Sequence, residues 1–142
     1  MIFLLLFSLL NLNADVSNSH HGCWKLESVK WQNKIRPPFN PNLQLYFIFY
    51  KNNTLRVYWN FKNDPETFCE RISSYSFDGE VLDETVLWLH PDNSPECSKD
   101  PDMHVGRNML TPLSVTSEKL TLHLNFSGDP LDYIYKTCEQ LP

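Results

Sequence analysis

Apolar and polar residues alternate along almost the whole chain after residue 22. Strand-favouring residues at every second position indicate β-strands, and no window keeps the 3.6-residue period of an amphipathic helix. A chain of 142 residues is long enough for one domain. The alternation therefore predicts a single all-β domain. We expect eight strands, over residues 22–31, 43–51, 54–61, 67–77, 80–90, 104–111, 119–126 and 131–139.

Turn residues divide the connections between these strands into short and long ones. Asp78-Gly79 marks a tight hairpin, because glycine tolerates the positive φ that such turns need. The apolar register of the second and third strands requires a three-residue loop that pairs Phe49 with Leu55 and leaves Asn53 left-handed. Long connections are expected at residues 32–42, 62–66 and 91–103. If the strands run up and down, all the long loops share one end, which is typical of a closed barrel with a mouth.

The four cysteines fit this barrel as two disulfides. Cys23 begins the first strand and Cys138 lies in the last, and these strands are neighbours when the meander closes. Cys69 opens the fourth strand, and Cys97 lies in the long loop that follows the fifth. We predict the pairs Cys23–Cys138 and Cys69–Cys97, each contributing about 2–4 kcal/mol. The spacings contain no C-x-x-C, so they indicate neither a zinc site nor a thioredoxin-like motif, and no metal site is expected.

The first twelve residues are almost wholly apolar. A run of this length is too short to span a bilayer, and it is typical of the apolar part of a signal peptide. We predict a signal peptide over residues 1–14, a flexible polar tail over 15–21 and the barrel domain over 22–142. The alternative is a buried N-terminal strand or helix. Export to the extracellular space, or to the periplasm of a bacterium, would provide the oxidising environment in which disulfides persist.

Charge and the scattered histidines exclude several function classes. The formal net charge is -5, and phosphate binding needs clustered lysine and arginine, so no nucleic-acid partner is expected. His90, His104 and His123 lie on or beside different strands with no nucleophile motif near them. We therefore expect a monomer that is not an enzyme, needs no cofactor and does not span a membrane.

The barrel interior is the candidate binding site. An eight-stranded barrel either fills its interior with side chains or holds one small ligand, and both alternatives stay open. The residues expected to point inward are Phe47, Phe49, Trp59, Phe61, Leu120, Leu122, Leu124 and Phe126. The candidate ligand-binding residues are Phe47, Phe49, Trp59, Phe61 and Trp88.

The hairpin around Asp78-Gly79 carries the charged candidates, and either of its faces could point inward. A two-residue turn pairs Glu84 with Ser73 and puts Glu70 on the opposite face, which argues against a pair of catalytic carboxylates. Arg71 shares a face with Glu84. The two could anchor a polar ligand, but we expect a surface ion pair, which would contribute little to stability.

Gly22-Cys23-Trp24 matches the G-x-W motif that opens the first strand of lipocalins. With eight strands and a signal sequence, the chain resembles the lipocalin-like domains of the calycin superfamily over residues 22–139. This resemblance implies that Trp24 plugs the closed end of the barrel and that a basic residue of the last strand, here Lys136, packs over it. The family's T-D-Y motif is missing, since TSEKL stands in that loop. A fold of this kind does not by itself give a function.

Two functions compete at this point. The first is a secreted lipocalin-like protein that binds a small apolar or amphipathic molecule, which enters between loops 32–42 and 91–103. The second is a secreted interaction or inhibitor protein that presents the same proline-rich loops to a protein partner, with a filled barrel. An interior cavity of several hundred Å³ would favour the first.

Overall fold

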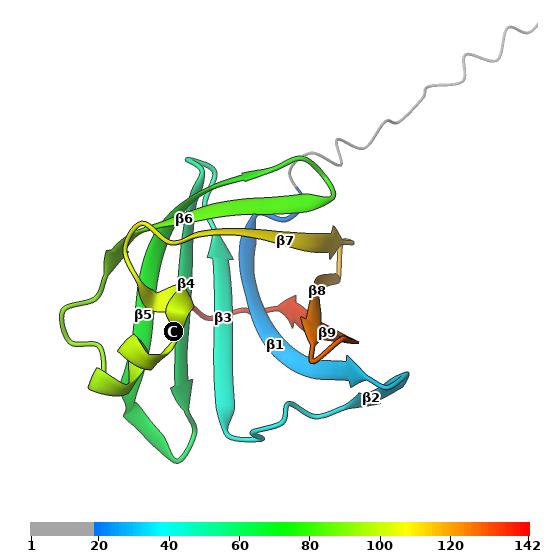
Figure 1. The fold of residues 1–142 in the computed structure, drawn as a ribbon, viewed down its shortest axis with the longest axis horizontal. Coiled ribbons are helices and arrows are strands. Elements are labelled where there is room, and N and C mark those ends of the chain that lie inside the picture. The colour runs from blue at the N-terminus through cyan, green and yellow to red at the C-terminus, as the bar shows by residue number, and fades with distance from the viewer. Residues whose placement is uncertain (1–18) are drawn as a thin grey trace, which may run out of the picture.

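One antiparallel sheet of nine strands makes up the fold and curls round until its two long edges meet (Figure 1). The structure is a computed structural model and describes residues 19–142. The predicted signal peptide lies outside the described residues, as do residues 15–18 of the predicted tail. The strands are β1 (Gly22–Trp31), β2 (Lys34–Arg36), β3 (Leu43–Phe49), β4 (Thr54–Phe61), β5 (Asp64–Phe77), β6 (Val81–Leu89), β7 (Asn108–Val115), β8 (Lys119–Phe126) and β9 (Asp129–Thr137).

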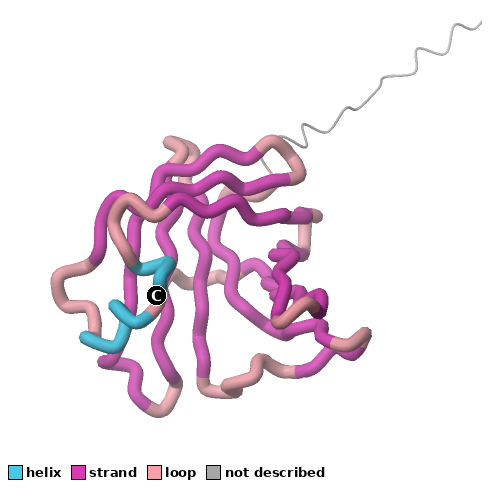
Figure 2. Tube along the Cα trace, in the orientation of Figure 1, coloured by secondary structure: helices cyan, strands magenta, loops and turns pink. Residues whose placement is uncertain are grey.

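The barrel closes through β1, which pairs with two neighbours. Its first residues pair with β3, and most of its length, from Trp24 to Trp31, pairs with β9. Each of the remaining strands from β3 to β9 pairs with the next along the chain. This confirms the predicted eight-stranded up-and-down barrel. Figure 2 shows that strands make up most of the trace, with short helices confined to one connection.

The hairpin between β3 and β4 has the predicted register. Phe49 lies opposite Leu55, and Asn53 has a φ of 60°. The next hairpin, between β5 and β6, differs from the prediction. The Asp78 carboxylate accepts hydrogen bonds from the backbone N–H groups of Glu80 and Val81, at 2.8 and 2.7 Å, which widens the turn. The pairing is therefore shifted by two residues.

That shift changes which residues face each other on β5 and β6. Tyr75, not Ser73, lies opposite Glu84. A bulge between Ile72 and Ser73 shifts the register once more nearer the mouth. Because side chains alternate between the two faces, each slip of one residue changes which side chains meet across the sheet.

Two of the predicted long connections contain unpredicted structure. Residues 32–42 include β2, which folds back on β1 through a turn where Gln32 and Asn33 have φ values of 51° and 58°. Residues 62–66 are not a long loop, because β5 already begins at Asp64, opposite Phe61. Pro65 is tolerated there because the β5–β6 ladder starts only at Arg71, so the missing N–H breaks no bond to β6.

The third long connection is the only one in the described residues that contains helices, and both are short. They are the 3₁₀-helices η2 (Pro95–Lys99) and η3 (Pro101–Met103), with Ser94 and Asp100 as N-caps. The strand β7 starts at Asn108, later than predicted, because the chain turns through residues 104–107 first. No helix within residues 19–142 has the length and apolar character needed to cross a membrane.

Two disulfides fix the two ends of the barrel. Cys23 is bonded to Cys138 next to the tight hairpins, and Cys69 is bonded to Cys97 in the long loop. The Cα atoms of the two pairs are 5.3 and 5.7 Å apart. These are the pairs that the sequence predicted. We call the end with the tight hairpins the closed end and the end with the loop that carries Cys97 the mouth.

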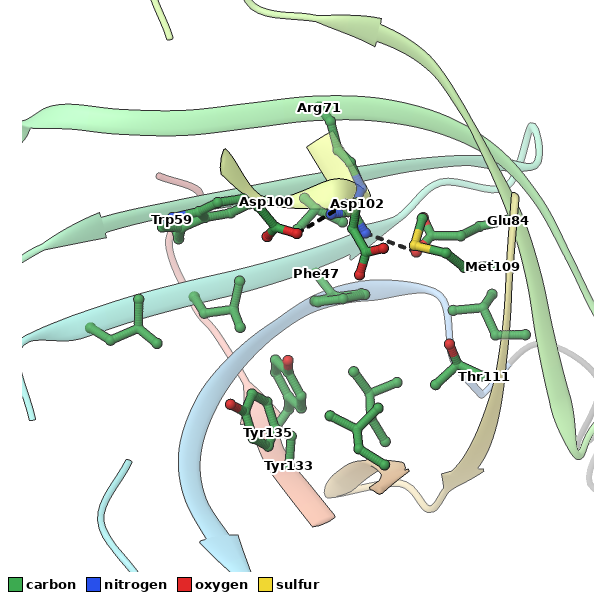
Figure 3. A pocket seen from close by; sticks show the side chains of 16 residues that line it. Phe47, Trp59, Arg71, Glu84, Asp100, Asp102, Met109, Thr111, Tyr133 and Tyr135 are labelled. Carbon is green, nitrogen blue, oxygen red and sulfur yellow. Dashed lines mark hydrogen bonds and ion pairs between the residues drawn. The ribbon is translucent and has the colours of Figure 1, made fainter. Parts of the chain in front are cut away.

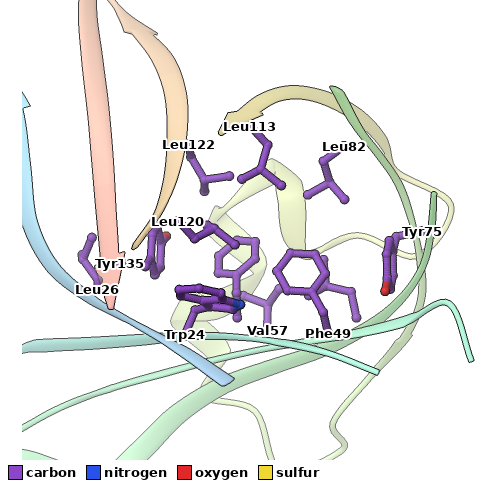
Figure 4. Close-up of a cluster of buried hydrophobic side chains, with 12 residues drawn as sticks. Trp24, Leu26, Phe49, Val57, Tyr75, Leu82, Leu113, Leu120, Leu122 and Tyr135 are labelled. Atoms are coloured by element: carbon purple, nitrogen blue, oxygen red, sulfur yellow. The ribbon is translucent and has the colours of Figure 1, made fainter. Parts of the chain in front are cut away.

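The hydrophobic core fills the closed end. Its side chains converge from strands around the whole barrel (Figure 4). The buried members are Trp24, Leu26, Phe47, Phe49, Leu55, Val57, Tyr75, Leu82, Leu113, Leu120, Leu122 and Tyr135. A second, smaller cluster of Cys69, Cys97 and Met103 anchors the long loop against the barrel at the mouth.

Candidate functional site

A cavity of about 390 Å³ occupies the barrel interior between the core and the mouth (Figure 3). Apolar side chains of six strands and two aspartates of the long loop form most of its wall. The lining residues are Leu43, Leu45, Phe47, Val57, Trp59, Arg71, Leu82, Glu84, Asp100, Asp102, Met109, Thr111, Leu122, Leu124, Tyr133 and Tyr135. The interior is therefore not completely filled by side chains.

The charged pair Arg71 and Glu84 lies inside the barrel. Nη2 of Arg71 on β5 donates to Oε1 of Glu84 on β6 at 2.8 Å, and the two side chains are only 6% and 4% exposed. Figure 3 shows these side chains pointing toward each other beside Met109. The expected surface ion pair is wrong, because Arg71 and Glu84 share the face of the hairpin that carries the buried residues Tyr75, Leu82 and Val86, and this face points inward. Glu70 lies on the outer face, where it pairs with Arg56.

Tyr133 and Tyr135 project from β9 across the cavity from this pair (Figure 3). Tyr135 is fully buried, and burial raises the pKa of its hydroxyl well above the usual value. Tyr133 and Glu84 raise this pKa further, whereas Arg71 lowers it. Arg71 and Glu84 therefore act electrostatically on the Tyr135 hydroxyl. The tyrosine remains a neutral hydroxyl, able to donate and to accept a hydrogen bond.

Two carboxylates lie at the mouth. Asp100 caps η3, since its Oδ1 accepts the backbone N–H of Asp102 at 2.9 Å. Asp102 pairs with Arg107 at 3.4 Å, and about half of each of these two side chains is exposed. Such exposed pairs contribute little to stability. The mouth side of the cavity is thus weakly acidic.

The candidate ligand-binding residues separate into three groups. Phe47 and Trp59 line the cavity. Phe49 is buried in the core of the closed end, and Phe61 is half-buried at the end of β4; neither lines the cavity. The prediction for Trp88 is wrong. It is 43% exposed, because the bulge pairs it with Ile72 on the outer face of the sheet.

Trp24 lies where the resemblance implied, but its partner is not Lys136. Trp24 and Leu26 point inward, opposite Thr137 and Tyr135, so Lys136 lies opposite Lys25 on the outer face. The Lys136 side chain is 61% exposed and pairs with Glu27 at 2.9 Å. The implied packing of Lys136 over the tryptophan is therefore wrong, because the neighbouring residue Tyr135 takes the inward position.

His20 covers the closed end instead. It is 5% exposed, and its backbone carbonyl accepts a hydrogen bond from Nε1 of Trp24 at 2.7 Å. Its ring meets the edges or faces of Phe49, Tyr75 and Phe77, with centroids 5.1–5.7 Å apart. Burial lowers the pKa of His20, and the neighbouring histidine lowers it further. The predicted flexible tail is thus wrong at His20, which no pattern in the sequence singles out.

Sequence reasoning also missed a hydrogen-bonded chain on the outer face. Oγ of Ser114 lies 2.6 Å from Nε2 of His123, and Nδ1 of that histidine lies 2.9 Å from Oδ1 of Asp132. This is the atom order of a hydrolase triad. However, the backbone around Ser114 is paired with β8 in the sheet, and the chain lies outside the cavity. The chain is thus separate from the candidate binding site.

The described residues hold no group of three or more histidine, cysteine, aspartate or glutamate side chains placed to bind a metal ion.

No protein-family model and no curated protein matches this sequence. Solved structures do. A lipocalin-like protein from Bacteroides uniformis ATCC 8492 is 13% identical, with 84% of this chain and 99% of that one covered, at a TM-score of 0.55. An uncharacterized protein from Bacteroides eggerthii DSM 20697 is 18% identical, with 83% and 98% covered, at a TM-score of 0.51. At these identities the likeness concerns the fold alone, an antiparallel β-barrel similar to that of the lipocalin-like protein.

Proposed function

We propose that this protein binds a small apolar or amphipathic molecule in the barrel cavity. The observation that carries the proposal is the cavity of about 390 Å³ with a mostly apolar wall and a few convergent polar groups. Sites for small ligands are typically concave, roughly 300–1,000 Å³ in volume, and lined in this way. The lipocalin-like fold supports the same role.

The competing role, a protein inhibitor with a filled barrel, has less support. It requires an interior occupied by its own side chains, whereas the core fills only the closed end. The proposed role is also not enzymatic, because the Ser114–His123–Asp132 chain lies on the outer face.

We place this binding activity outside the cytosol. The two disulfides support an oxidising compartment, extracellular or periplasmic, because such bonds rarely persist among cytosolic proteins.

Native mass spectrometry of the protein purified from its source tests the proposal. We expect a small molecule to be retained by the wild-type protein and lost from Leu124→Trp, which places a larger side chain in the cavity wall. Leu110→Trp is the matched control, because Leu110 is 67% exposed on β7. Retention of a protein and of no small molecule would favour the inhibitor. Equal retention by both variants would place the ligand outside the cavity.

A further inference from the structure

The base of the cavity holds polar atoms that find no partner within the protein. Among the described residues, these buried atoms include Nε of Arg71, Oε2 of Glu84, Oγ of Ser73 and Oη of Tyr135. The four residues are between 0 and 5% exposed. Arg71, Glu84 and Tyr135 line the cavity, and Ser73 lies between Arg71 and Tyr75 on the inward face of β5. Buried polar groups are normally hydrogen-bonded, so this concentration points to a bound group that the protein does not itself supply.

Charge restricts what that group can be. Arg71 and Glu84 already neutralise each other at 2.8 Å. A carboxylate placed beside them would face the Glu84 charge, and an ammonium would face the Arg71 charge. Either ion would leave one uncompensated charge in a buried site, which is strongly unfavourable. Asp100 and Asp102 further disfavour an anion, and because Asp102 is already paired with Arg107, only Asp100 is left to attract a cation on the mouth side of the cavity.

Hydrogen-bond directions restrict the group further. Nε of Arg71 can only donate, and the Glu84 carboxylate can only accept. A head group that satisfies both must therefore both accept and donate. Water can form such bonds in an empty polar cavity, so a ligand that cannot reproduce them loses affinity when it displaces the water. A hydroxyl or a primary amide meets this requirement, whereas a purely apolar molecule does not.

The rest of the cavity shows where the apolar part of such a ligand would lie. Leu43, Leu45 and Leu124 line the cavity nearer the mouth, on parts of β3 and β8 beyond the core. We propose that the cavity takes an uncharged amphiphile whose amide or hydroxyl head group binds at Arg71, Glu84 and Tyr135, with its tail against these leucines. This inference rests on the proposed function, since it names the ligand class of the same cavity.

Isothermal titration with four probes that share one tail tests it: octanamide, 1-octanol, octanoate and octylammonium. At about pH 7 the last two are charged. We expect octanamide and 1-octanol to bind with Kd values about tenfold or more below those of both ions, because an ionic head leaves an unpaired buried charge. A displaceable apolar dye, N-phenyl-1-naphthylamine, reports separately on whether the cavity binds anything.

Two variants test the roles of the charged pair and of the tyrosine hydroxyl, and thermal melts verify that each variant folds. Glu84→Gln keeps the shape of the side chain and leaves Arg71 unbalanced, so it should improve octanoate binding relative to octanamide by about tenfold. Tyr135→Phe should weaken octanamide by about three- to tenfold through one lost hydrogen bond. Tyr133→Phe is its matched control. It should leave octanamide binding unchanged, since the Tyr133 hydroxyl is not among the buried unpartnered atoms.

The failures of the two proposals are distinguishable. If neither the dye nor any of the four probes binds, the proposed function is wrong and the ligand class falls with it. If the dye binds and the four probes bind with equal Kd values, or if octanoate or octylammonium binds best, the cavity is a ligand site but the uncharged head group is wrong. If Glu84→Gln does not fold, the four probes on the wild-type protein and the Tyr135→Phe variant still show whether the preferred head group is uncharged.

Discussion

The closed end and the mouth of this barrel are built from the same strands, but side chains fill the interior at the closed end and leave a cavity toward the mouth. At the closed end the inward side chains meet as a core, with Trp24, Leu120 and Leu82 at most 2% exposed. Toward the mouth the inward positions surround a cavity and include a buried ion pair. The division runs along single strands: on β5 the inward residues change from Tyr75 to Arg71 within four positions.

This difference shows how one alternating pattern serves both stability and binding. Apolar inward residues stabilise the fold in proportion to the area that they bury. A charged pair in the same kind of position rarely adds stability compared with apolar side chains of similar size. Local departures from the rules of a stable core are expected at functional sites. Arg71 and Glu84 are such a departure, and the closed end compensates for it.

The largest expected effect comes from removing the central side chain of the closed end. Trp24→Ala should lower the free energy of unfolding by about 3–5 kcal/mol, because it leaves a void among buried neighbours. Trp59→Ala, the same change in the half-buried cavity wall, should lower it clearly less. Urea unfolding followed by circular dichroism measures both. Equal losses would mean that the two ends are equally well packed.

Removing each disulfide should have smaller effects, one mainly on stability and the other mainly on ligand binding. Their sequence separations are 115 and 28 residues. Loop entropy then predicts that the Cys23→Ala/Cys138→Ala variant loses about 1 kcal/mol more stability than the Cys69→Ala/Cys97→Ala variant. The second variant should lose more affinity for octanamide, because it releases the loop that carries Asp100. Urea unfolding and titration measure the two effects, and the reverse ranking in both would contradict the division of roles.

A smaller effect should appear as a pH dependence of the closed end. Because burial lowers the pKa of His20, the unfolded chain binds more protons than the native protein in the mildly acidic range. The stability that the neutral ring provides is therefore complete above about pH 6.5 and is lost as the pH falls from there through the lower folded-state value. His20→Gln should show a weaker loss of stability between about pH 7 and pH 5 in urea titrations. Identical slopes would mean that the native protein accommodates the charged ring.

The smallest expected effect concerns the outer face, which belongs to neither end. Ser114→Ala should change the free energy of unfolding by less than about 0.5 kcal/mol, as most surface substitutions do. It should also leave the hydrolysis of p-nitrophenyl acetate at the wild-type level, because Ser114 lies on the outer face and does not line the cavity. A serine-dependent rate above that of Ser114→Ala would reveal a third functional region.

Much of the architecture could be predicted because alternation has a strict period of two. The β3–β4 register follows from its apolar residues alone, and the cysteine pairs follow from the strand order. The site was harder to predict. Whether Arg71 and Glu84 point inward could not be decided from the local pattern, because both faces of this hairpin carry apolar residues. The error at Lys136 is of another kind, since one position of the alternation decides between Tyr135 inside and Lys136 outside.

His20 shows the second reason why prediction fails. Its burial depends on the cluster of Phe49, Tyr75 and Phe77, which come together only when the barrel closes. A polar residue before the first strand carries no periodic signal of such a contact. Long-range packing of this kind is therefore outside the reach of local patterns.

The way both chain ends are fastened has a practical consequence. His20 is held over Trp24, Cys138 is bonded to Cys23, and the carbonyl oxygen of Pro142 lies 3.4 Å from Arg56 on the outer wall. Both ends of the described chain are thus attached at or near the closed end. A linker joined at either end of the described residues, for example to a sensor chip or a fused reporter, would leave the mouth oriented toward the solution. The protein could then be immobilised without blocking the cavity.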